Sequence, residues 1–115
     1  MDRVCVVFPI LAGKTTHARN FQRELSEQRM ADYDRSERRI GITAEHWFIA
    51  SVPGGDQLVA YIESENFGAA LGQFSRSRDG FDLWFKEQLA AATGVDLNNP
   101  PPDMQLPELV STYTA

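Results

Sequence analysis

The sequence is poor in the residues that build disulfides and metal centres. Cys5 is its single cysteine, so no disulfide can form within the chain and nothing points to an oxidising compartment. His17 and His46 are its two histidines, and neither has a second histidine or a carboxylate cluster at the spacing of a metal site. We therefore expect no metal ion.

Basic residues are also in deficit. The chain has 11 lysines and arginines against 16 aspartates and glutamates, which gives a formal net charge of -5. Nucleic acids and anionic membranes attract basic surfaces, so the composition predicts neither as a partner. No apolar run is long enough to span a membrane, and the apolar stretch near the start is too short for a secretory signal. We expect a cytoplasmic protein.

Residues 44–65 carry the clearest pattern in the sequence. Two runs rich in β-branched and aromatic residues flank Pro53-Gly54-Gly55-Asp56, which predicts a β-hairpin with a short loop. Alternate residues of a strand point to opposite faces of a sheet. Phe48 then belongs to one face and Trp47 to the other, so both faces of the hairpin carry large apolar groups.

The remaining segments place this hairpin in a larger fold. We predict a strand at residues 3–11 and a helix from 15 to about 38, whose charged later part fits a continuation, a second short helix or a kinked lid. A helix interrupted at 75–80 is expected between 67 and 93, followed by a proline-rich connector at 95–107 and a last strand or tail at 108–115.

Single residues mark where these helices begin and end. Gly41 and Gly94 are predicted to end helices in the left-handed conformation. Asp79 is predicted to begin the second half of the interrupted helix, and Thr15 or Thr16 to cap the first helix.

The order strand, helix, strand, strand, broken helix, strand is that of the ferredoxin-like βαββαβ fold, an α+β fold with an antiparallel sheet. At 115 residues the chain fits a single domain. Both helices of this fold lie on one face of the sheet, which leaves the other apolar face uncovered. We predict that a second copy covers it in a homodimer; the alternative is that the tail folds back over it.

The element order and a set of short motifs carry a family resemblance. The motifs are Arg39-Ile40-Gly41-Ile42-Thr43, Glu45, Trp47-Phe48, Gly55-Asp56, Tyr61, Glu63, Phe81-Asp82, Trp84-Phe85 and Gly94-Val95-Asp96-Leu97 followed by prolines. The order resembles the dimeric α/β-barrel superfamily, which includes antibiotic-biosynthesis monooxygenases, haem-degrading enzymes and stress-responsive barrel proteins. The motifs resemble a family of small uncharacterised bacterial proteins. The resemblance implies a pocket between sheet and helices and no particular activity.

The resemblance also bears on cofactors. Some members of the superfamily bind haem through a histidine on the second helix, but residues 67–93 contain no histidine. The sequence also has no flavin, nicotinamide or nucleotide motif. We therefore expect no cofactor.

His46, Tyr61 and Glu63 are the catalytic candidates. A histidine inside a strand, next to Phe48 on the same face, is poised to titrate near neutrality and to act as a general base. The alternative is a histidine satisfied within the core or the dimer interface.

The ligand-binding candidates are Glu45, Trp47, Arg39, Arg78 and Trp84. We expect Trp47 and Tyr61 to lie opposite each other on one face, with Glu45 and Glu63 near the same end, where carboxylates beside an aromatic wall suit a cationic or polyhydroxylated ligand. In the alternative, Glu45 or Glu63 forms a structural salt bridge with Arg38, Arg39 or Arg78.

Two functions from different classes remain open. The first is a non-catalytic, small-molecule-binding or stress-related dimer. The second is a cofactor-independent monooxygenase or isomerase that acts on an aromatic or enolisable compound.

Overall fold

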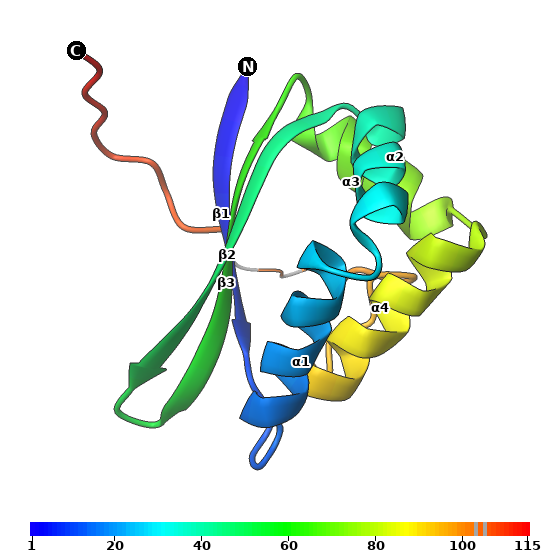
Figure 1. Ribbon diagram of the computed structural model, residues 1–115. Helices are drawn as coiled ribbons and strands as arrows, with labels where there is room; N and C mark the ends of the chain where they lie inside the picture. The colour runs from blue at the N-terminus through cyan, green and yellow to red at the C-terminus, as the bar shows by residue number, and fades with distance from the viewer. Residues whose placement is uncertain (103, 105) are drawn as a thin grey trace.

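The protein folds into a three-stranded antiparallel sheet with four helices on one side (Figure 1). The computed structural model describes residues 1–102, 104 and 106–115. The strands are β1 (Asp2–Pro9), β2 (Ile42–Val52) and β3 (Gly55–Ser64), in the spatial order β1-β3-β2. The helices are α1 (Thr15–Ser26), α2 (Met30–Ile40), α3 (Phe67–Arg76) and α4 (Gly80–Thr93).

The predicted α+β class with an antiparallel sheet is confirmed, but the predicted strand count is wrong. No strand forms within 106–115, where Leu109 and Val110 are 60% and 80% exposed. The chain end lies on the side of the sheet opposite the helices (Figure 1). The β-branched residues of this segment do not suffice for a strand, because β propensity depends on packing against a neighbouring strand. The predicted connector at 95–107 includes positions 103 and 105, which lie outside the described residues.

The helix predicted from 15 to 38 is two helices, the second of the three alternatives that the sequence left open. The break falls at Glu27, whose backbone leaves the helical region. The predicted threonine cap is wrong as well, because the residue before α1 is Lys14 and no side chain caps the helix. Thr15 Oγ1 instead donates a hydrogen bond to Asp56 Oδ2, 2.7 Å away, and so ties α1 to the start of β3.

The other predicted helix boundaries are confirmed. Gly41 follows α2 with φ +84° and Gly94 follows α4 with φ +77°, a region that a side chain disfavours. Asp79 precedes α4 and its carboxylate accepts hydrogen bonds from the backbone N–H groups of Phe81 and Asp82.

The core lies between the sheet and the helix layer. Alternate residues of the strands point into it, among them Val6, Phe8, Leu58, Ala60 and Ile62. Phe85 of α4 lies at its centre, with ring centroids 5.1 Å from Phe21 and 5.2 Å from Phe74 in edge-to-face geometry. Burial of each such side chain contributes roughly 1.5–3 kcal/mol. In the described part of the chain, no helix combines the length and apolar character needed to cross a bilayer.

The hairpin has a shorter loop than predicted, and its register differs by one residue from the expected pairing of Trp47 with Tyr61. Val52 pairs with Gly55, so the loop is Pro53-Gly54, and Tyr61 pairs with His46 instead of Trp47. Trp47 pairs with Ala60 and faces the helices. The expectation that Trp47 and Tyr61 share a face is therefore wrong, since a shift of one residue moves a side chain to the opposite side of the sheet.

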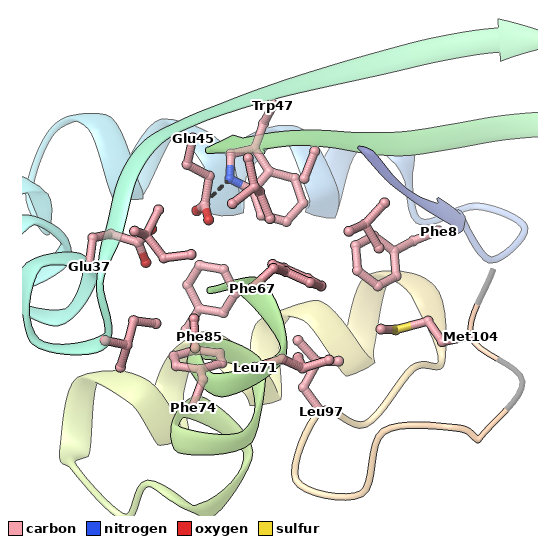
Figure 2. Close-up of a pocket in the computed structure, with 16 residues that line it drawn as sticks. Phe8, Glu37, Glu45, Trp47, Phe67, Leu71, Phe74, Phe85, Leu97 and Met104 are labelled. Carbon is pink, nitrogen blue, oxygen red and sulfur yellow. Dashed lines mark hydrogen bonds between the residues drawn. The ribbon is translucent and has the colours of Figure 1, made fainter. Parts of the chain in front are cut away.

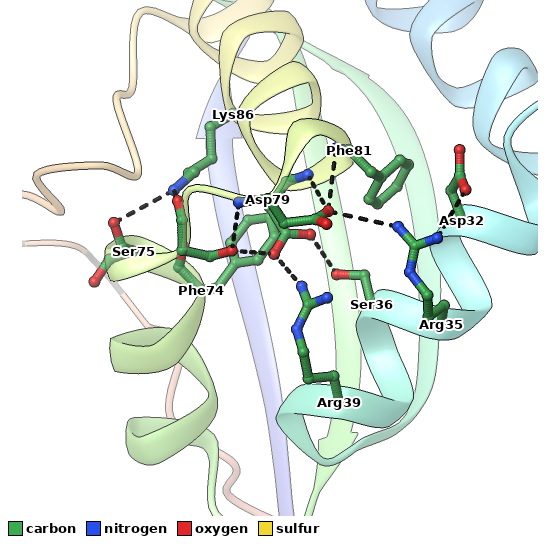
Figure 3. A network of polar contacts seen from close by, with 11 residues as sticks. Asp32, Arg35, Ser36, Arg39, Phe74, Ser75, Asp79, Phe81 and Lys86 are labelled. Atoms are coloured by element: carbon green, nitrogen blue, oxygen red, sulfur yellow. Dashed lines mark hydrogen bonds and ion pairs between the residues drawn. The ribbon is translucent and has the colours of Figure 1, made fainter.

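A buried polar network holds α2 against α4 (Figure 3). Asp82 on α4 is fully buried and accepts hydrogen bonds from Ser36 Oγ at 2.6 Å and from Arg39, both on α2. Ser77 Oγ, in the link between α3 and α4, also donates to Asp82. Three donors replace the water that this carboxylate loses on folding.

Lys86 fastens α3 to α4 in a similar way. Its side chain is fully buried, and Nζ donates to the backbone carbonyls of Phe74, Ser75 and Ser77 at 2.8, 3.3 and 2.9 Å. These carbonyls lie at the end of α3, where the last turn of a helix leaves its acceptors unpaired. Burial lowers the pKa of Lys86.

We predict that Asp82→Ala lowers the free energy of unfolding by about 3 kcal/mol or more, because it leaves Arg39, Ser36 and Ser77 without their acceptor. Asp34→Ala is the matched control. Asp34 is the exposed partner of Arg38 within α2, and its removal should change the free energy of unfolding by less than about 1 kcal/mol. Urea denaturation of the two variants measures both values. Equal losses would contradict the structural role of the network.

Candidate functional site

A mostly apolar cavity of about 60 Å³ lies between the inner face of the sheet and the helix layer (Figure 2). Strands β1, β2 and β3 form one wall, and α2, α3 and α4 with the segment after α4 form the other. Its lining residues are Val6, Phe8, Glu37, Ile40, Ile42, Glu45, Trp47, Ala60, Ile62, Phe67, Ala70, Leu71, Phe74, Phe85, Leu97 and Met104. This lining includes no lysine, arginine or histidine.

Two carboxyl groups form the polar end of this cavity. Glu37 projects from α2 and Glu45 from β2 (Figure 2). A β-bulge between Ile42 and Ala44 allows both Ile42 and Glu45 to face inward although they are three residues apart. Glu45 thus faces the core, a position that charged residues occupy rarely unless they are paired or serve a function.

Glu45 is held by two donors. Its Oε2 accepts a hydrogen bond from Trp47 Nε1 at 3.0 Å and another from the Tyr33 hydroxyl. Burial raises the pKa of Glu45, and the hydrogen bonds from Tyr33, Glu37 and Trp47 oppose this rise. Burial, followed by the nearby Glu45 charge, raises the pKa of Tyr33 as well, so the phenol keeps its proton and remains a donor.

Glu37 lacks this support. Its Oε2 is buried and finds no donor among the described residues. Burial is the largest cause that raises the pKa of Glu37, to about 10, and the charge of Glu45 is the next. Glu37 is therefore protonated at neutral pH and donates a hydrogen bond to Glu45.

The two carboxyl groups have unequal surroundings. Two donors favour the charge on Glu45, whereas the buried Oε2 of Glu37 has no donor among the described residues. Two carboxyl groups whose surroundings separate their protonation states are the usual arrangement for general acid–base chemistry. Within the described residues, no group of three or more His, Cys, Asp or Glu side chains is arranged to hold a metal ion.

Of the ligand-binding candidates, Glu45 and Trp47 lie in the cavity and the others do not. Arg39 is bound to Asp82, and Arg78 is exposed in the link between α3 and α4. Trp84 packs against Phe21, and the Arg29 guanidinium lies 4.3 Å from its ring centroid. These contacts use the side of α4 that bears Trp84, while the next residue, Phe85, faces the cavity.

The salt-bridge alternative for Glu45 is wrong. Its partners are Tyr33 and Trp47, whereas Arg38 pairs with Asp34 and Arg39 with Asp82.

The catalytic candidates lie together on the other side of the sheet. His46 is exposed there, with its ring centroid 6.2 Å from that of Tyr61, and Tyr61 donates a hydrogen bond to Glu63 Oε2 at 2.8 Å. That hydrogen bond raises the pKa of Tyr61. The register shift separates this group from Glu45 and Trp47, and its catalytic role stays a prediction.

Tyr33 and Glu37 are the site residues that the sequence patterns did not reveal. Together with Ile40 they occupy positions i, i+4 and i+7 of α2, which is one face of a helix. That spacing was available in the sequence, but the many charges around it concealed the stripe.

We predict that Glu37 makes the protein less stable as pH rises. Below about pH 4.5 the folded and unfolded states both carry its proton; between there and about pH 10 only the folded state keeps it, so stability falls with a slope of up to about 1.4 kcal/mol per pH unit. Glu37→Gln should flatten this slope in urea denaturation between pH 5 and 9. Glu87→Gln, on the exposed side of α4, is the control and should follow the wild type. Parallel profiles for wild type and Glu37→Gln would contradict the assignment.

Comparison with known proteins supports the fold. No family model matches this sequence, and no curated protein matches it either. Among solved structures, the chain is similar to tetracenomycin F2 cyclase from Streptomyces glaucescens, described as a type-II polyketide cyclase. The TM-score is 0.57 at 15% sequence identity, over 100% of this chain and 99% of that chain. At this identity the similarity supports the fold alone, a small α+β fold with an antiparallel sheet and helices on one side.

Proposed function

We propose that the protein binds an enolisable carbonyl compound beside Glu37 and Glu45 and transfers protons to and from it. The observation that supports this proposal is two neighbouring carboxyl groups at the end of an apolar cavity, of which Glu45 accepts hydrogen bonds from Tyr33 and Trp47 and Glu37 has a buried Oε2 with no donor among the described residues. An isolated pair of buried carboxyl groups costs stability, and such costs persist mainly where they serve a function.

The chemistry follows from the two protonation states. The Glu45 carboxylate removes a proton from the carbon next to the carbonyl, while Glu37 donates its proton to the carbonyl oxygen, which yields an enol and reverses the roles of the two groups. Return of a proton to another carbon gives an isomer, and attack of the enol carbon on a second carbonyl closes a ring. No electrons are gained or lost, so no redox cofactor is needed.

The surroundings of the pair suit this substrate class. Phe8, Phe67 and Trp47 offer aromatic surface to an unsaturated or aromatic compound. The structural neighbour is described as a polyketide cyclase, and we take from it only ring closure as a class of reaction. A cofactor-independent monooxygenase begins with the same deprotonation, so the pair suits that reaction as well.

The second candidate is a non-catalytic, small-molecule-binding or stress-related protein. The size of the cavity favours it, because about 60 Å³ does not hold a ring system without rearrangement. In this case the carboxyl pair only anchors a ligand by hydrogen bonds.

We also propose a homodimer that covers the open face, by which we mean the side of the sheet formed by Cys5, Val7, His46, Phe48, Val59 and Tyr61. These residues pair across the strands and point away from the helices. Phe48 is 59% exposed at the centre of β2. Apolar side chains grouped on a sheet are typical of an interface, and a two-fold axis would pack one open face on another.

Deuterium exchange tests the proposed chemistry. With 2-tetralone, an aromatic ketone with acidic C–H groups, the wild type should accelerate deuterium uptake from D₂O in NMR spectra, and Glu45→Gln should slow it by about 10²-fold or more. Glu87→Gln, on the exposed side of α4, should leave the rate unchanged. Absence of acceleration with 2-tetralone and with a set of acyclic β-diketones would favour the non-catalytic candidate.

Light scattering tests the dimer. The wild type should have twice the chain mass of 12.9 kDa, and Phe48→Lys should shift it toward the monomer because a charge in the centre of an apolar interface is left unpaired. Val110→Lys changes a more exposed apolar residue of the tail and should keep the dimer. A wild type that stays monomeric at micromolar concentration would overturn this assembly.

A further inference from the structure

The carboxyl pair borders a second, larger cavity on the outside of the molecule. This outer cleft has a volume of about 540 Å³ and lies where α2 passes into β2. It shares Glu37, Ile42 and Glu45 with the inner cavity, so these three residues form the wall between the two. The complete lining is Met30, Tyr33, Asp34, Glu37, Arg38, Gly41, Ile42, Thr43, Ala44, Glu45 and Glu65.

Local backbone geometry opens this cleft. Gly41 ends α2 in the left-handed conformation, and the β-bulge that follows lies between Ile42 and Ala44. Both features turn the chain sharply, and a bulge bends its strand away from regular pairing. The cleft is therefore built into the link between α2 and β2.

Size separates the roles of the two cavities. Binding sites for small organic ligands usually measure about 300–1,000 Å³. The outer cleft falls in this range and the inner cavity, at about 60 Å³, does not. A ligand body therefore fits the outer cleft, and only its reacting end reaches the wall of Glu37 and Glu45.

The charges around the cleft restrict the ligand further. Four carboxyl residues line it, Asp34, Glu37, Glu45 and Glu65, of which Glu37 keeps its proton at neutral pH, and Arg38 is the single cation in this lining. The Arg38 Nε already lies 3.0 Å from both carboxylate oxygens of Asp34. An anionic ligand would meet uncompensated negative charge here, which disfavours carboxylates and phosphates.

The neutral polar groups suit hydroxyls. Thr43 Oγ1 donates to the backbone carbonyl of Glu63 at 3.1 Å and keeps lone pairs that accept. Glu65 follows β3 and is exposed, so its carboxylate accepts hydrogen bonds from a ligand. Tyr33, Met30 and Ile42 supply apolar surface between these polar groups.

We propose that the outer cleft binds the body of an uncharged, hydroxylated ring compound, with its hydroxyls on Thr43 and Glu65 and its carbonyl at Glu37 and Glu45. The proposal rests on the proposed function for the role of the carboxyl pair and adds the ligand class and the route by which the ligand reaches it.

Three naphthalenes that differ in charge test the ligand class. Isothermal titration calorimetry at pH 7 compares 2,7-dihydroxynaphthalene, 2-naphthoate and 2-naphthylmethylammonium. The diol should bind, and the naphthoate should bind at least about tenfold more weakly. Glu65→Gln and Thr43→Val should each weaken the diol by about tenfold through loss of one hydrogen bond. The exposed Glu87→Gln on α4 is the control and should have no effect.

Amide chemical-shift changes then locate the bound diol. The amide signals of Thr43 and Glu65 should shift when the diol binds, and the amide signal of Phe48 on the open face should not. The proposal would be overturned if the naphthoate bound as tightly as the diol or if the ammonium compound bound most tightly of the three. It would also be overturned by shift changes confined to the open face, or by no binding of the diol up to about 1 mM. Deuterium exchange of 2-tetralone reports on the carboxyl pair separately. If Glu45→Gln abolishes exchange while the Glu65 and Thr43 variants leave diol binding intact, the proposed function stands and the outer cleft fails.

Discussion

The burial of two neighbouring carboxyl groups is the constraint on which the site depends. Glu37 and Glu45 lie where water is scarce, and removal of water penalises the charged form of each. Because both cannot be ionised side by side in such a place, they hold a proton between them. The donors are distributed unequally, since Tyr33 and Trp47 both bond to Glu45. This inequality favours the charge on Glu45 over the charge on Glu37.

The rest of the fold keeps the pair together. Glu37 follows Ser36 on α2, and Ser36 and Arg39 are fixed to the buried Asp82 of α4. The charge of Asp82 also contributes, after burial and Glu45, to the raised pKa of Glu37. Lys86, one turn further along α4, binds the carbonyls at the end of α3. Polar contacts buried in this way are costly to break, so α2 cannot move its glutamate away from β2 without disrupting the helix layer.

Much of the fold could be predicted from local patterns. Alternation groups Val6 with Phe8 on one face of their strand and Leu58 with Ile62 on one face of theirs, and all four are buried. Gly41 and Gly94 end helices because a left-handed residue is cheap only without a side chain. The site was harder to predict, because Glu45 and Trp47 could be assigned to one face of a strand but not to the correct partners. The observed register pairs Tyr61 with His46, one residue away from the expected Trp47, and this places Tyr61 and Glu63 on the face opposite Trp47.

The sequence by itself determined which residues are apolar at each strand face, that Gly41 and Gly94 end helices and Asp79 begins one, and that the sheet has large side chains on both sides. These properties depend on the nearest neighbours along the chain. Only the tertiary structure decided that Glu37 and Tyr33 of a charged helix meet Glu45 of a strand, and that residues 109–114 form no fourth strand. Such contacts join segments far apart in sequence, and their energies depend on how much water the packed helices exclude. No pattern within one segment contains that information.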